Sequence, residues 1–349
     1  MQTNHDSKRF SIYPLFCVLF LMEALIACTP PSACLTADTN RTFVQLWRDD
    51  AKRTTTDWDQ WFLQIEHLGF DEIIVQWSSY DDISFHVDSR PGYENAPCLE
   101  AFTRAALKHQ KRIWLGLDYD PGFWEAIDAS PGGVKQYLSM RLSKIKQRLP
   151  YLLQSLQAID AQDKIIQGWY ISDEIDDVNW RDPLRQQFLF AYLKDLRLVL
   201  HKAHKDWPVL ISGFSNGACP PDDLTTFWNT ALKFTGIDGV LFQDGVGAGK
   251  LSLDQLETYL NHFHSHLEDA DHRFGVIVEL FEFTKNNSKQ PHALQSAQFS
   301  RVSQQIFLAQ QYSTLPITVF SAPDYLKSDG DQQSRKLYRD WEIDRAFCQ

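Results

Sequence analysis

Short apolar runs alternate with longer amphipathic stretches eight times between residues 42 and 349. Each run has the length and β-branched content of a buried strand, and each stretch has the spacing of a helix with one apolar face. Because strands that alternate with helices pair in parallel, the pattern predicts an α/β fold, a single (β/α)8 TIM barrel. The predicted strands are Thr42–Trp47, Glu72–Trp77, Arg112–Asp118, Ile165–Ile171, Pro208–Phe214, Asp238–Gln243, Phe274–Phe281 and Pro316–Phe320.

The predicted helices follow these strands in turn, and the third is expected to break at Pro150. An open doubly wound sheet is the competing fold, but no glycine-rich phosphate turn follows the first strand. The segment Gly245–Leu251 has the glycines of a phosphate loop, yet Asp244 and Leu251 stand where such a loop requires Gly and Ser or Thr. The helices are Asp57–Leu68, Leu99–His109, Gly133–Ala158, Pro183–His204, Asp222–Thr235, Ser252–Leu267, Ala293–Tyr312 and Gln332–Arg345.

The N-terminal residues have the pattern of an export signal. Lys8 and Arg9 precede an apolar stretch that ends in Leu-Ile-Ala-Cys28. This ending resembles the lipobox of bacterial lipoproteins, which implies cleavage before Cys28, acylation of its sulfur and a membrane anchor in the cell envelope. Residues 1–27 are thus predicted as a signal peptide, 28–41 as a spacer and 42–349 as the barrel. Thr29 after the cysteine favours the outer membrane, facing the periplasm or the exterior; an uncleaved anchor helix is the alternative.

Cys34, Cys98, Cys219 and Cys348 lie outside the export segment, in an oxidising compartment. The chain ends meet in a closed barrel, which favours a Cys34–Cys348 disulfide; Cys98 with Cys219 is a weaker second pair. No two cysteines have metal-ligand spacing, so neither a metal site nor a cofactor is predicted. The net charge of −11 argues against a nucleic-acid partner, and a monomer is expected.

In such barrels the chemistry lies at the carboxyl ends of the strands. Acids, amides and aromatic side chains collect at those positions, while Lys and Arg are nearly absent, which favours a neutral or cationic sugar over a phosphorylated substrate. Carboxylates beside aromatic rings suit carbohydrate chemistry. The predicted substrate-binding residues are Trp47, Gln76, Trp77, Asp118, Tyr119, Tyr170, Asn216, Gln243, Asp244, Glu282 and Tyr325.

Two glutamates stand at strand ends on opposite sides of the predicted barrel mouth, Glu174 after the fourth strand and Glu279 at the seventh. Glycosidic cleavage needs one carboxyl to protonate the leaving oxygen and a second to attack or stabilise the anomeric carbon. The chain here resembles the retaining glycosidase barrels, which implies Glu174 as acid/base with a raised pKa and Glu279 as an ionised nucleophile. Glu279 is preferred to Glu282 because it is in phase with Ile277 along the strand.

Asp173 departs from the Asn that those barrels usually have at this position. The adjacent Asp173 and Glu174 also resemble the substrate-assisted hexosaminidases, in which the Asp orients the 2-acetamido group that attacks. An amino-sugar polysaccharide would fit, because an ionised Asp173 accepts an N–H hydrogen bond. Since a fold does not dictate its chemistry, the same barrel could also bind carbohydrate without cleaving it, or form a structural subunit of an envelope assembly.

As a whole, the chain resembles a bacterial family of glycoside-hydrolase-like barrels known as domain of unknown function forty-four thirty-four. The resemblance spans nearly the whole mature chain and includes the Gln-Leu-Trp and Val-Gln-Trp of the first two strands. It implies a carbohydrate-active enzyme, here an envelope glycoside hydrolase that acts on an oligo- or polysaccharide. The segments that carry it are Gly168–Asp176, Gln243–Gly247 and Glu279–Glu282.

Overall fold

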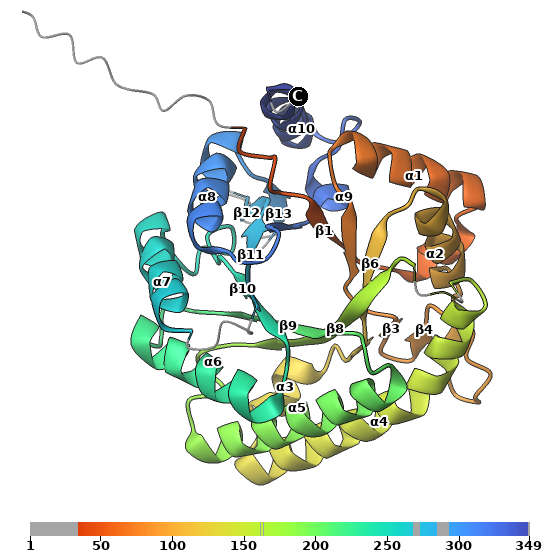
Figure 1. Cartoon of the computed structure of the whole chain (residues 1–349), viewed down its shortest axis with the longest axis vertical. Coiled ribbons are helices and arrows are strands. Elements are labelled where there is room, and N and C mark those ends of the chain that lie inside the picture. Colours follow the sequence, from red (N-terminus) through yellow and green to blue (C-terminus); the bar gives the residue numbers. More distant parts are fainter. Residues whose placement is uncertain (1–33, 161, 163, 268–272, 285–292, 348–349) are drawn as a thin grey trace, which may run out of the picture. The chain divides into compact units, whose positions relative to one another are not determined.

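The computed structural model describes residues 34–160, 162, 164–267, 273–284 and 293–347. Eight parallel strands close into a barrel in the order β1-β14-β11-β10-β9-β8-β6-β2, which confirms the predicted fold (Figure 1). The barrel strands are β1 (Arg41–Val44), β2 (Glu72–Val75), β6 (Arg112–Gly116), β8 (Ile166–Ile175), β9 (Val209–Phe214), β10 (Gly239–Gln243), β11 (Arg273–Glu279) and β14 (Thr318–Phe320).

Helices surround the strands and connect each one to the next (Figure 1). Their apolar faces cover the outside of the barrel, where most of the hydrophobic core lies. The helices are α1 (Thr55–His67), α2 (Leu99–Lys108), α3 (Phe123–Ile127), α4 (Pro131–Gln157), α5 (Pro183–Ala203), α6 (Pro221–Thr235), α7 (Leu253–His266), α8 (Phe299–Tyr312), α9 (Ala322–Tyr325) and α10 (Gln332–Ala346), with a short 3-10 helix, η1 (Arg48–Lys52).

Two helices differ from their predicted extents. Helix α4 continues through Pro150 without the expected break. The ring removes one backbone hydrogen bond, but Leu149 and Leu152 are buried on either side of it, and this packing holds the helix together. Helix α8 begins at Phe299 because the preceding residues form strand β13 (Leu294–Ser296), which pairs antiparallel with β12 (Phe281–Phe283).

The inside of the barrel is filled by one large side chain from each strand. These side chains form a cluster separate from the core between strands and helices. The residues are Phe43, Ile74, Trp114, Tyr170, Leu210, Leu241 and Ile277, with Phe320 packed against them. The barrel is therefore a packed core rather than a channel, and space for a ligand is left only at its ends.

A buried ion pair closes the amino end of the barrel. Arg41 Nε donates to Glu72 Oε2 at 2.7 Å, and Trp114 Nε1 donates to the same oxygen at 3.2 Å. The Arg41 guanidinium also lies 5.3 Å from the centre of the Trp114 ring. These groups pair with one another in the interior, so the ion pair belongs to the packing of this end of the barrel.

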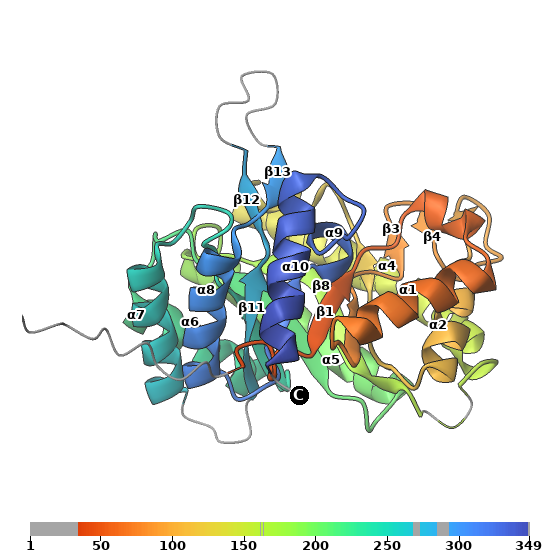
Figure 2. The ribbon, with the colours of Figure 1, turned by 90° about the horizontal axis from the view of Figure 1, so that it is seen from above.

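Two small sheets extend beyond the carboxyl ends of the barrel strands, on the same side of the molecule (Figure 2). One is the β12–β13 hairpin. The other has the order β5-β4-β3-β7, and its central pair β3 and β7 comes directly after the barrel strands β2 and β6 in the chain. Its strands are β3 (Ser79–Tyr80), β4 (Ile83–Ser84), β5 (Glu94–Asn95) and β7 (Asp118–Tyr119).

Residues 34–41, predicted as part of the spacer, pack against the end of the barrel chain. The backbone N–H of Thr36 donates to Asp344 Oδ2 at 3.0 Å, and the N–H of Ile317 donates to the carbonyl of Asp38 at 3.3 Å. Thr36 is fully buried. The barrel unit thus begins several residues before the predicted boundary, because these backbone groups find partners on α10 and before β14.

Among the described residues, one cysteine is disulfide-bonded and two are free thiols. Cys34 is disulfide-bonded, while its predicted partner Cys348, the predicted signal peptide and Cys28 lie outside the described residues. Cys98 and Cys219 are free thiols, so the second predicted pair is wrong. Within the described ranges, none of the helices combines the length and apolarity needed to cross a bilayer.

Candidate active site

A cavity of about 300 Å³ opens at the carboxyl end of the barrel strands. One part of its lining is polar and holds two carboxyls, two amides, a phenol and an ammonium group. The rest is apolar and includes four phenylalanine rings. The lining residues are Phe43, Gln76, Tyr170, Glu174, Gln243, Ala248, Lys250, Ile277, Glu279, Phe281, Phe283, Leu294 and Phe320. Such a mixture of flat apolar surface and directional polar groups suits a sugar ring.

A β-bulge near the end of β8 sets the position at which Glu174 pairs with β9. The pairing with β9 is regular up to Ile171 and then jumps, so that Glu174 is the next residue to pair, opposite Ser212. Ser172 and Asp173 are the extra residues of the bulge, and Ser172 Oγ donates to the carbonyl of Gln76 at 2.7 Å. Glu174 therefore continues the inward face of the strand, whereas its neighbour Asp173 points outward.

Glu174 is held in the cavity by the side-chain amide of Gln243. Gln243 Nε2, at the end of β10, donates to Glu174 Oε1 at 2.7 Å. Burial raises the pKa of Glu174, and the hydrogen bond from Gln243 and the nearby ammonium group of Lys250 offset only part of that effect. A carboxyl with a raised pKa keeps its proton to higher pH, which is the state that a general acid needs.

Glu279 lies on β11 in phase with Ile277, and both line the cavity. The backbone N–H of Ala248 donates to Glu279 Oε2 at 2.7 Å. Burial raises the pKa of Glu279, and the carboxylate of Asp244 raises it further. This direction is opposite to the expectation that the carboxyl stays readily ionised, because a second acid lies close behind it.

Asp244 lies in the wall behind Glu279 and does not line the cavity. Its carboxylate accepts hydrogen bonds from the side chain of Gln305 and from the backbone N–H groups of Val246, at 3.1 Å, and Glu279, at 3.3 Å. Burial nevertheless raises the pKa of Asp244. The structure thus contradicts the predicted contact of Asp244 with substrate. The side chain is fully buried, and its hydrogen bonds hold the loop after β10 in place.

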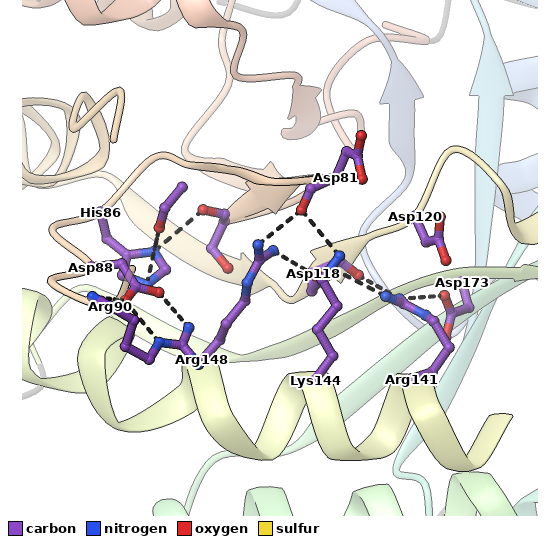
Figure 3. Close-up of polar contacts among 12 residues, drawn as sticks. Asp81, His86, Asp88, Arg90, Asp118, Asp120, Arg141, Lys144, Arg148 and Asp173 are labelled. Carbon is purple, nitrogen blue, oxygen red and sulfur yellow. Dashed lines mark hydrogen bonds and ion pairs between the residues drawn. The ribbon is translucent and has the colours of Figure 1, made fainter. Parts of the chain in front are cut away.

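Asp118 and Asp173 are buried in an ion-pair cluster outside the cavity, where the structure contradicts their predicted contact with substrate (Figure 3). Arg141 of α4 donates to Asp118 Oδ1 at 3.1 Å and to Asp173 Oδ1 at 2.8 Å. Arg148 donates to Asp118 Oδ2 at 2.7 Å, and the hydroxyl of Tyr192 donates to Asp173 Oδ2 at 2.7 Å. Every carboxylate oxygen of the two acids thus has a partner on a covering helix.

Four aromatic rings pack together at the same end of the barrel, next to the cavity. The ring of Trp77 lies 5.2 Å from Trp47 and 5.1 Å from Tyr119, and Tyr80 stacks on Tyr119 at 5.4 Å. Burial raises the pKa of Tyr119 to about 12, and the carboxylate of Glu174 adds to that shift. Trp77 is buried, whereas Trp47 is 46% exposed and presents a flat apolar surface to solvent. None of these four is among the described residues that line the cavity.

Three other predicted binding residues also lie outside the cavity lining. Asn216 is exposed and donates to Asp177 Oδ1. Glu282 accepts a hydrogen bond from Gln295 at 3.1 Å on the β12–β13 hairpin. The ring of Tyr325 packs 5.5 Å from the cavity residue Phe281, and so supports the apolar wall from behind.

The sequence indicates neither Lys250 nor the apolar wall as part of the site. Lys250 belongs to the glycine-rich segment that lacks the flanking residues of a phosphate loop. Phe43 and Phe320 could have been found, because strict alternation along β1 and β14 turns them inward. Phe283 and Leu294 could not, because they reach the cavity only through the pairing of β12 with β13.

Asp177 organises the loop that follows β9. Its carboxylate accepts hydrogen bonds from Ser215 Oγ at 2.6 Å and from the N–H groups of Asn216, Ala218 and Cys219 at 2.8 to 3.1 Å. Burial alone would raise the pKa of Asp177, but these hydrogen bonds outweigh it, so the pKa lies below its usual value. The ionised carboxylate therefore stabilises the folded loop.

Replacing Asp177 by Asn is expected to lower the free energy of unfolding at pH 7 by about 1–3 kcal/mol, because an amide NH2 would face backbone donors. A group with a depressed folded-state pKa stabilises the fold above its unfolded pKa, about 3.9, and loses that effect as the pH falls through the folded value. Urea unfolding at several pH values should show the wild type and D177N converging as the pH falls through the lowered pKa of Asp177. A difference that stayed the same at every acidic pH at which both proteins still fold would contradict this role.

Fold and site together define a (β/α)8 barrel that carries two buried carboxyls in a cavity at the carboxyl ends of its strands. Residues 40–332 match the family described as Domain of unknown function (DUF4434), and the chain belongs to that family. It is also 32% identical to the "Uncharacterized protein YbcH" of Escherichia coli (strain K12) over 236 residues. The matched region covers 66% of this chain and 73% of that one.

Solved structures with similar folds include proteins named as glycosidases. A putative alpha-L-fucosidase from Bacteroides thetaiotaomicron superposes with a TM-score of 0.67 at 17% identity, over 87% of this chain and 92% of that one. An endo-1,4-beta-mannanase from Rhizomucor miehei has a TM-score of 0.58 at 15% identity, over 88% and 95% of the two chains. At these identities the likeness establishes the barrel fold.

Proposed function

We propose that this protein is a glycoside hydrolase that acts on a cell-envelope or extracellular polysaccharide. Glu174 would be its general acid/base, and Glu279 its nucleophile or second carboxylate. The observation that carries the proposal is the single cavity lining shared by these two carboxyls, from β8 and β11. β8 and β11 are separated by β9 and β10 in the barrel, so the two groups approach a ligand from different sides. The names of the similar solved structures agree with this class of reaction.

The environments of the two carboxyls support the division of roles. Glu174 accepts a hydrogen bond from the amide of Gln243 and has a raised pKa, as a proton donor to a leaving oxygen requires. Glu279 is held by one backbone N–H at Oε2, which leaves Oε1 available to the cavity. A mechanism that uses Asp173 to orient a 2-acetamido group has less support, because both oxygens of Asp173 are bound by Arg141 and Tyr192.

A carbohydrate-binding barrel without hydrolysis is the second candidate. The observation that favours it is the raised pKa of Glu279, because a protonated carboxyl is a poor nucleophile. The two candidates share the cavity and differ only in turnover. Binding of a polysaccharide without the release of reducing ends would favour this second function.

A polysaccharide screen tests the proposal directly. The purified mature protein would be incubated with envelope and biofilm polysaccharides, including amino-sugar polymers, and reducing ends would be measured. The anomeric configuration of the first product, followed by NMR, distinguishes retention from inversion. Substrates that show neither turnover nor binding across the screen would oppose both candidates.

We also propose that the protein is anchored in the cell envelope by a lipid on Cys28. The support is the lipobox-like Leu-Ile-Ala-Cys ending of the N-terminal apolar stretch. Cells fed a radiolabelled fatty acid should incorporate the label into the wild type but not into the Cys28→Ser variant, which should lose its membrane association. Equal labelling of both proteins would contradict the anchor.

A further inference from the structure

The glycine-rich segment after β10, residues 245–250, wraps around the side chain of Glu279. Gly245 and Gly249 have φ angles of +67° and +65°, which turn the chain back toward the barrel. Gly247 leaves room for this approach, since a Cβ there would lie 2.8 Å from Glu279 Cβ and 2.3 Å from the carbonyl oxygen of Phe281. The motif that resembles a phosphate loop therefore serves close contact with a carboxyl, which Ala248 N–H completes.

The same segment delivers Lys250 into the cavity. Among the described residues that line the cavity, Lys250 alone is cationic, and it shares that lining with Glu174 and Glu279. Its Nζ lies 3.1 Å from the centre of the Phe214 ring, and it makes no ion pair within 4 Å in the described part of the chain. Its charge is thus not committed to another carboxylate by direct contact.

Arg301 is the other described cation that lowers the pKa of Glu279, and its effect is smaller than that of Lys250. Asp244 lies behind Glu279 and Glu174 lies in the same cavity, so both add negative charge. Arg301 of α8 is near, but its Nη2 donates to the carbonyl oxygens of Glu279, at 3.4 Å, and of Phe281, and its Nε lies 3.9 Å from Glu282. The phenol of Tyr325 is uncharged at neutral pH, since burial raises its pKa to about 12.

We propose that Lys250 is a positioning residue whose ammonium group favours the ionised form of Glu279 in the cavity. A sugar that displaces water would strengthen the interaction, because charges act over longer distances in a dry site. Double displacement requires an ionised Glu279, and Lys250 favours that state, while the same ammonium group also lowers the pKa of Glu174. This catalytic meaning rests on the proposed function, whereas the electrostatic effect on Glu279 does not.

The test is a direct titration of Glu279 that needs no substrate. Protein carrying ¹³C at the side-chain carboxyls of glutamate would be titrated by NMR, with the Glu279 signal assigned by its loss in Glu279→Gln. Replacing Lys250 by Met or Gln should raise the pKa of Glu279 by about one unit, while Lys250→Arg should leave it near the wild-type value. Lys336→Met, which removes an exposed lysine of α10, is the matched control and should cause no shift.

An unchanged Glu279 titration in both neutral variants, at unchanged thermal stability, would overturn the inference. Two neutral variants are used because one of them could disturb the loop. For a substrate that the screen identifies, the acidic limb of the pH profile of kcat/KM should shift to higher pH in Lys250→Met, by the same amount as the pKa of Glu279. A shifted titration without any hydrolysis would contradict the proposed function but retain the role of Lys250 in the ionisation of Glu279.

Discussion

Replacing Glu174 by Gln is expected to lower kcat by about a thousandfold on the polysaccharide that the screen identifies. Gln keeps the size of the side chain and can still pair with Gln243, so the fold should be preserved. What is lost is the proton that the leaving oxygen needs. The loss should be much smaller on an aryl glycoside with an acidic phenol as leaving group, because such a group departs without protonation. Initial rates on the two substrates measure this difference.

Glu282→Gln provides the matched control for this prediction. It makes the same chemical change on β12, close to Glu279 in sequence, but Glu282 is not among the described residues that line the cavity. Its kcat should stay within about twofold of the wild type. Similar losses in the Glu174 and Glu282 variants would contradict the assignment of Glu174, as would equal losses of Glu174→Gln on both types of substrate.

Replacing Arg141 by Met is expected to lower the free energy of unfolding by about 3–5 kcal/mol. Arg141 is fully buried and bridges Asp118 and Asp173, so the variant would leave two interior carboxylates with fewer partners (Figure 3). Because Asp173 precedes Glu174 in the bulge of β8, the loss should also loosen the strand end that carries the candidate acid. Urea unfolding followed by tryptophan fluorescence measures the first effect.

Lys144→Met tests whether the loss is specific to the buried bridge. Lys144 lies on the same helix, but its ammonium group is partly exposed and 3.8 Å from Asp118. Its removal should cost less than about 1 kcal/mol, as for other pairs near the surface. If the two variants were equally stable, the cluster would not be what holds the end of β8.

Local sequence was sufficient to predict the barrel and the two carboxyls. The apolar runs begin within a few residues of the observed strands, and helices α5 and α6 start within one residue of their predicted positions. The phase of Glu279 with Ile277 also predicted which glutamate of the seventh strand faces the cavity. These successes share a cause, since strand alternation and helix capping depend on neighbouring residues in the chain.

The partners of the other acids could not be predicted in this way. Asp118 and Asp173 were expected at the barrel mouth because they follow strands. Arg141 and Arg148 belong to α4, and only the packing of that helix against the strand ends brings them to these acids. The bulge of β8 has no local signal either, although it decides that Glu174 is the residue opposite Ser212.

The sequence by itself determined the eight βα units, the strand ends at which acids and aromatics collect, and the two glutamates that were expected to act there. The tertiary structure alone decided that Glu279 has a second acid behind it, that Lys250 enters the same cavity, and that an apolar wall completes the site. The physical reason is that hydrogen bonding along a strand or helix is a local property. The charge and solvent exposure of a side chain, in contrast, depend on residues that folding brings near from distant parts of the chain.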